Sequence, residues 1–293
     1  MRRLRAAALG LLALGGCVVP AAETPSASPI GDAAIAPRPP EGAFIYSGEP
    51  TQGGWIRGEA PAGTTSARLD EEPLALDAAG RFFAAFDRDA GPSATLVARL
   101  ADGRVVETAV TIAPRAWDIE RVDVARTQGK TDEEFLAIRK PELARIAAAR
   151  AVRSPSDGWR QAFIWPARGR ISGRFGSQRI YMGGEAGGYH SGIDIAPGAG
   201  TPIVAPAHGV VVLAAEQPFS LEGHLLIVDH GAGLNSAFLH CDTLAVKVGD
   251  KVHQGQKIAT VGMTGRATGP HLHWSLMWRG ARLDPLLLAG PMR

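Results

Sequence analysis

The first 189 residues of this 293-residue chain contain no histidine. All eight histidines lie between His190 and His273, whereas an even scatter would have placed several in the first half. Cysteine is scarcer still, with only Cys17 and Cys241, so a disulfide framework and a structural zinc site built on cysteine pairs are both excluded. The crowded histidines instead indicate a metal site or acid–base chemistry in the second half.

The chain also lacks a strong net charge. Its formal charge is +2, and removing the positive charges of Arg2, Arg3 and Arg5 leaves −1. Nucleic-acid-binding domains are expected to carry a basic face, so nucleic acid is excluded as a partner. The apolar run from Ala6 to Leu14 is too short for a permanent membrane span and has the length of a signal-peptide core.

The end of this apolar run, Leu14-Gly15-Gly16-Cys17, resembles a bacterial lipobox, in which the cysteine is lipidated and becomes the first mature residue. We therefore predict a lipoprotein signal at residues 1–17 and a membrane anchor on Cys17. Val18 stands where an inner-membrane retention signal would place Asp, so the resemblance implies a periplasmic protein on the inner leaflet of the outer membrane. The alternative is a plain secretory signal with an incidental cysteine.

Three segments separate this signal from the histidine-containing domain, and the first two are a tether and a strand-rich region. Residues 18–41 are rich in Ala, Pro and Ser without an apolar period, which predicts an extended tether. Residues 42–114 show short alternating strands, with a hairpin turning at 101–103 and a second turn at 77–80. This pattern predicts a small β-sandwich without a catalytic cluster, in an accessory or partner-binding role.

Residues 115–156 are predicted to form a helical linker, because the sequence from Asp118 to Arg153 has a helical pattern. Thr131 and Glu134 fit a capping box, and Pro141 is tolerable as the first residue of a second helix. In residues 157–293 the sequence pattern again predicts β-strands, which are joined by glycine-rich turns. Strands are expected at 209–213, 225–229, 235–240, 257–261 and 271–277, which makes the overall fold class mainly β with an antiparallel C-terminal sheet.

Two short pieces of the last domain carry its chemistry. His190 and Asp194 are four residues apart, and His271 and His273 are two apart on an expected strand, so the side chains of each pair can share a face. Four candidate ligands then converge if the two strands are neighbours. Two imidazoles and one carboxylate with a position left for water are typical of catalytic zinc, and also of non-haem iron oxygenases.

The motifs together resemble the lysostaphin-type (LytM-like) zinc metalloendopeptidases, which cut peptide cross-links in bacterial peptidoglycan. The resemblance covers about residues 163–288 and rests on His190-Ser191-Gly192-Ile193-Asp194, Ala205-Pro206-Ala207-His208-Gly209, Phe238-Leu239-His240 and Gly269-Pro270-His271-Leu272-His273. It implies a duplicated-hybrid-motif-like fold. It also implies that His190, Asp194 and His273 bind one Zn²⁺, and that His240 and His271 are the catalytic pair. Peptidoglycan stem peptides would be the substrate, with divisome proteins or amidases as further candidate partners.

Two alternatives stay open beside this interpretation: a non-haem iron oxygenase, and a catalytically silent member of the same family. Some members of the family lose ligands and act as silent activators of amidases, although this chain keeps all five positions. Where the family often has Tyr-x-His-Leu, this chain has Phe238-Leu239-His240-Cys241, a change that removes no ligand. The other histidines are expected in turns or on the surface, Cys241 as a buried apolar thiol, and Arg174 either in a salt bridge or against a substrate carboxylate.

Overall fold

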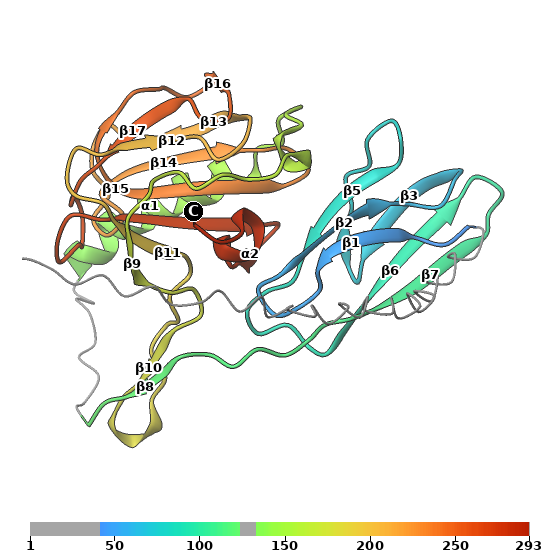
Figure 1. Ribbon diagram of the computed structural model, residues 1–293, viewed down its shortest axis with the longest axis horizontal. Helices are drawn as coiled ribbons and strands as arrows, with labels where there is room; N and C mark the ends of the chain where they lie inside the picture. Colours follow the sequence, from blue (N-terminus) through green and yellow to red (C-terminus); the bar gives the residue numbers. More distant parts are fainter. Residues whose placement is uncertain (1–41, 124–132, 293) are drawn as a thin grey trace, which may run out of the picture. The chain divides into compact units, whose positions relative to one another are not determined.

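The computed structural model describes residues 42–123 and 133–292, which belong to one compact unit beginning at Pro39 (Figure 1). Strands dominate its elements, and the expected mainly β class is confirmed. The predicted signal peptide, Cys17, the tether and the capping residue Thr131 lie outside the described residues. Within those residues, no helix has the length and apolarity needed to cross a membrane. The predicted domain boundaries stay a prediction.

The N-terminal strands form two antiparallel sheets. One is ordered β1 (Ile45–Glu49), β2 (Trp55–Glu59) and β5 (Arg81–Ala85); the other is ordered β4 (Glu72–Pro73), β3 (Thr64–Leu69), β6 (Ser93–Leu100) and β7 (Val105–Thr111). Leu96 and Val110 are fully buried on β6 and β7, where exposed and buried positions alternate, whereas β5 is buried continuously from Phe82 to Ala85. The expected hairpin is confirmed, since β6 pairs with β7 around Gly103, whose φ of 86° suits glycine in a tight turn.

The linker differs from its prediction in two ways. Strand β8 (Ile119–Arg121) replaces the expected start of helix, and it pairs in parallel with β10 (Gln178–Ile180). Because the partner strand of β8 is distant in the sequence, the three residues of β8 carry no local pattern that predicts a strand. Helix α1 (Glu133–Ala151) is continuous through Pro141, where two helices were expected. Proline costs the helix one hydrogen bond there, but ion pairs of Arg139 and Glu142 hold both sides of the interruption.

The C-terminal domain is a ten-stranded sheet whose pairings are all antiparallel. Its main path runs through β16 (Lys251–Val252), β13 (Gly209–Ala214), β14 (His224–Asp229), β15 (Leu234–Leu244), β18 (Leu272–Trp278), β11 (Ile193–Ala196) and β9 (Arg170–Gly173). Three further strands pair beside this path: β12 (Pro202–Val204), β17 (Lys257–Val261) and β19 (Ala281–Leu283). All five expected strands are present, although β15 runs further and β18 begins one residue after His271.

Side-chain alternation on β11 and β18 separates the core from the candidate site. Ile193, Ile195, Leu272 and Trp274 are almost completely buried. Their strand neighbours project to the opposite face, which leaves that face for polar groups. Short helical pieces complete the domain: 3₁₀ turns at Gly158–Arg160 and Met182–Gly184, and α2 (Pro285–Ala289).

Candidate metal centre and catalytic groove

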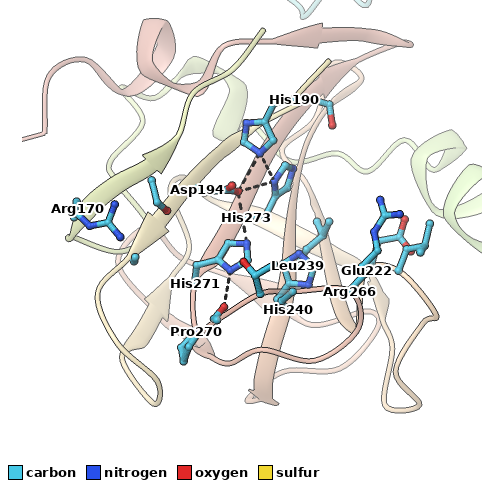
Figure 2. Close-up of a pocket in the computed structure, with 17 residues that line it drawn as sticks. Arg170, His190, Asp194, Glu222, Leu239, His240, Arg266, Pro270, His271 and His273 are labelled. Carbon is cyan, nitrogen blue, oxygen red and sulfur yellow. Dashed lines mark hydrogen bonds and ion pairs between the residues drawn. The ribbon is translucent and has the colours of Figure 1, made fainter. Parts of the chain in front are cut away.

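Three of the four candidate ligands meet at the junction of β11 and β18. Asp194 and His273 are direct partners in the antiparallel register, and His190 lies in the loop that enters β11. His190 Nε2 is 3.1 Å from Asp194 Oδ1 and 3.0 Å from His273 Nδ1, and His273 Nδ1 is 2.9 Å from Asp194 Oδ1. Figure 2 shows these three side chains converging on one point.

The arrangement of these donor atoms fits a divalent metal such as zinc. Tetrahedral ligands at zinc distances lie about 3.3 Å from one another, close to the three separations found here. His190 donates its Nδ1 proton to the carbonyl of Arg174 at 3.0 Å, which leaves the Nε2 lone pair for the ion. Burial would raise the pKa of Asp194, but hydrogen bonds and charges of His190 and His273 outweigh it and lower that pKa, so the carboxylate is ionised.

Two glycines make room for this cluster. A Cβ atom on Gly173 would lie 2.4 Å from Asp194 Oδ2, and one on Gly192 would lie 2.7 Å from His273 Nε2. Neither distance is tolerable, so both positions require glycine for the ligands to keep their places. Sequence reasoning did not find this role, because it depends on the partner strand.

His271, the fourth candidate, lies beside the cluster with its Nε2 3.8 Å from Asp194 Oδ1. Its Nδ1 donates to the carbonyl of Gly269 at 2.8 Å, and the Nδ1 of His240 donates to the carbonyl of Thr264 at the same distance. Because a carbonyl oxygen only accepts, both rings carry their proton on Nδ1 and keep Nε2 as the free acceptor. The two ring centroids are 4.8 Å apart.

His240 is held in a backbone conformation that non-glycine residues rarely adopt. Its φ is 62°, at a point where the pairing of β15 with its neighbours shifts register. The side chain is 7% exposed, and burial, together with the charges of His271 and His273, lowers its pKa. The imidazole is therefore neutral near pH 7 and able to accept a proton.

The five residues lie in a groove of about 550 Å³ whose walls include Arg170, Glu222 and Arg266. A second hollow of about 830 Å³ shares His190, Asp194 and Arg266 with the first. The cluster thus lies where two hollows meet, and an extended chain can cross it with room on both sides. The exposed guanidinium groups of Arg170 and Arg266 favour anionic groups on that chain.

The remaining histidines lie outside this groove. His208, His224 and His253 are part-buried or exposed. His230 begins a turn as expected, but it is completely buried instead of on the surface, because Nδ1 donates to the carbonyl of His208 and Nε2 pairs with the Ser236 hydroxyl, both at 2.7 Å. Burial lowers its pKa to about 4.

Cys241, next to His240 in the chain, is completely buried and free. The expectation of a buried apolar thiol is confirmed, and burial raises the pKa of this thiol to about 12. Arg174 is exposed and contributes its carbonyl to His190.

An antiparallel β domain carrying a metal-ligand cluster beside two proton-accepting histidines is the framework of a metallopeptidase. The profile of Peptidase family M23 matches residues 188–285, so this part of the chain carries a peptidase M23 domain. A crystal structure from Pseudomonas aeruginosa, titled as a peptidase M23, covers 84% of this chain and 96% of its own, with a TM-score of 0.63 and 28% identity.

Two curated relatives carry different names. Peptidoglycan DD-endopeptidase ShyA of Vibrio cholerae is 36% identical over 132 residues, which are 45% of this chain and 30% of the relative. Murein hydrolase activator NlpD of Salmonella dublin is 35% identical over 140 residues, 48% of this chain and 33% of the relative. The chain spans about a third of the length of these relatives.

Proposed function

We propose that this protein is a zinc-dependent endopeptidase that hydrolyses peptide cross-links of bacterial peptidoglycan. The observation that carries the proposal is the complete set of five side chains in one groove: His190, Asp194 and His273 as ligands, with His240 and His271 beside them. The name of ShyA supports peptidoglycan as the substrate class. The other alternative, a non-haem iron oxygenase, does not account for the two additional histidines, His240 and His271, beside the ligand cluster.

In this proposal His190, Asp194 and His273 would hold Zn²⁺, which when bound would supply polarisation of a carbonyl oxygen and a more acidic water molecule. The Nε2 lone pair of His271, 3.8 Å from Asp194 Oδ1, receives the proton of the attacking water. His240 presents a second neutral acceptor, and protonated imidazole in this pair returns the proton to the leaving amide nitrogen. The main-chain carbonyls of Gly269 and Thr264 fix both rings in the tautomer that this transfer needs.

The groove suits an extended peptide with free carboxylates. Arg170 and Arg266 stand exposed on its walls, and stem peptides carry carboxylates that two guanidinium groups can bind. Acylation of Cys17 would place the groove in the periplasm on the inner leaflet of the outer membrane, facing this substrate. The predicted tether and β-sandwich would then provide reach and positioning.

The similarity to NlpD favours one other function, activation of a separate amidase by a catalytically silent domain. A single experiment distinguishes the two. Full-length protein purified in detergent and loaded with zinc is incubated with peptidoglycan, alone and with a cell-wall amidase. The proposal predicts loss of cross-links without the amidase and no loss after chelation; intact cross-links together with a stimulated amidase would establish the activator function instead.

A further inference from the structure

Helix α1 is tied to the rim of the groove by a shielded charge network. The guanidinium group of Arg139 donates to both carboxylate oxygens of Glu222, at 2.6 and 2.7 Å, and to Glu142 at 3.0 Å. The three side chains are only 11–16% exposed. A two-pronged guanidinium–carboxylate contact fixes orientation as well as distance, and partial burial protects it from screening.

Glu142, one turn further along α1, grips the same rim at a second point. One of its carboxylate oxygens accepts the main-chain N–H of Ser220 at 2.5 Å, and the other accepts the Ser220 hydroxyl at 2.6 Å. The helix therefore holds both ends of the segment 220–222, which joins β13 to β14.

This segment in turn supports the catalytic groove through its main chain. The carbonyl of Glu222 accepts the N–H of His240 at 2.8 Å, and the carbonyl of Leu221 accepts the N–H of Arg266 at 2.9 Å. His240 has a φ of 62°, a left-handed conformation that persists in a non-glycine residue only when its surroundings enforce it. The N–H bond to Glu222 and the ring bond to Thr264 are two polar restraints on this conformation.

We propose that Arg139 and Glu142 of α1 are positioning residues for His240. They fix segment 220–222, whose carbonyl at Glu222 holds His240 in its left-handed conformation, with the ring against His271. The consequence for catalysis rests on the proposed function, whereas the restraint on His240 does not. Arg139 lies 101 positions before His240 in the sequence, and its hydrogen bonds go to Glu222 and Glu142 and to none of the candidate metal ligands. Its effect therefore reaches the site through the segment 220–222 that these two carboxylates hold.

The restraint is tested by amide hydrogen exchange in the zinc-loaded full-length protein. Arg139→Met is expected to accelerate exchange of the His240 amide at least tenfold. The amide of His230, which donates to Leu234 in the same domain, serves as internal reference and is expected to keep its rate. Lys140→Met, an exposed neighbour on the same helix, is the matched control and should change neither amide.

The link through Glu222 is tested by combining variants. Arg139→Met, Glu222→Gln and the double variant should accelerate exchange of the His240 amide to a similar extent, because each breaks the same contact. Arg139→Lys keeps the charge without the two-pronged contact and should fall between wild type and Arg139→Met. In turnover, Arg139→Met should lower kcat about tenfold with KM within twofold and zinc content unchanged.

Several results would overturn the proposal. One is an unchanged exchange rate at His240 in Arg139→Met, and another is an equal acceleration at His230, which would indicate general destabilisation. Additive effects of the Arg139 and Glu222 variants would show that they act separately. A wild-type protein without turnover would refute the proposed function alone, since the exchange measurements decide the restraint on His240 independently.

Discussion

His240 and His271 lie with their ring centroids 4.8 Å apart, and each donates its Nδ1 proton to a main-chain carbonyl. His240 lies within β15 and His271 directly before β18, yet the two rings reach the groove in the same tautomer. Two free Nε2 acceptors therefore stand beside the ligand cluster of His190, Asp194 and His273. The proposed division between rings that bind the metal and rings that accept protons predicts separable effects of substitution.

Replacing His271 should abolish turnover and leave the metal in place. His271→Ala removes a proton acceptor worth about 10²–10⁴-fold in rate, while the three ligand side chains keep their contacts. Turnover of a cross-linked muropeptide and zinc content by atomic emission check this. His253→Ala, an exposed histidine outside the groove, is the matched control. A variant that folds but loses its zinc would show that His271 is a ligand.

The two glycines under the cluster should be intolerant of even one methyl group. Gly173→Ala places a carbon 2.4 Å from Asp194 Oδ2, and Gly192→Ala places one 2.7 Å from His273 Nε2. Shifting one ligand is expected to weaken zinc binding roughly tenfold or more, as changes around metal ligands commonly do. Competition with a chromogenic chelator measures the affinity. Gly188→Ala, where a Cβ meets nothing within 4 Å, should bind as wild type; equal affinities for all three variants would contradict the packing argument.

Much of this site could be predicted from the sequence, because its signals are local. The spacing of His271 and His273, the pairing of His190 with Asp194 and the absence of cysteine pairs indicated a catalytic metal centre without any structure. The strands from 209 to 277 were also visible in their alternation and turns. The direct register of Asp194 against His273 was not, since pairing between strands 79 residues apart leaves no local pattern.

The features that sequence reasoning missed depend on tertiary contacts. Strand β8 has only three residues and pairs with a strand distant in the sequence, so its sequence could not be distinguished from the helical pattern around it. Gly173 and Gly192 matter only because of the ligands packed against them. His230 looked like a turn residue, whereas its burial follows from partners at His208 and Ser236. The ion pair between Arg139 and Glu222 joins α1 to the loop between β13 and β14, which no sequence motif connects.

The buried His230 predicts a specific loss of stability in mild acid. Its folded pKa of about 4 lies below the usual value of about 6.5, so the unfolded chain binds more protons between these values. The contribution is complete above about pH 6.5 and is lost as pH falls toward 4, with about 2 kcal/mol gone between pH 7 and 5. Urea unfolding at both pH values, with metal chelated, measures it.

His230→Gln is the comparison variant, since its side chain does not titrate. Its unfolding free energy should change about 2 kcal/mol less than that of the wild type between pH 7 and 5. Identical changes in the two proteins would mean that His230 does not remain neutral when folded.

Cys241 should be chemically silent in the folded protein. Its thiol is completely buried with a pKa raised to about 12, so almost no thiolate exists near neutrality. Iodoacetamide at pH 8 followed by peptide mapping should leave the Cys241 peptide unmodified in native protein and alkylated after unfolding in guanidinium. Rapid alkylation of the native protein would assign the thiol to the groove instead of the core.

The central claim, hydrolysis of a peptide cross-link at this groove, is tested most directly with a purified dimeric muropeptide in oxygen-18 water. Zinc-loaded full-length protein and its His271→Ala variant are incubated with the dimer, and the products are read by mass spectrometry. The account predicts that the wild type releases two monomers, one carrying a single heavy oxygen at its new carboxyl group, and that His271→Ala releases none. An intact dimer with the folded, zinc-loaded wild type would contradict it.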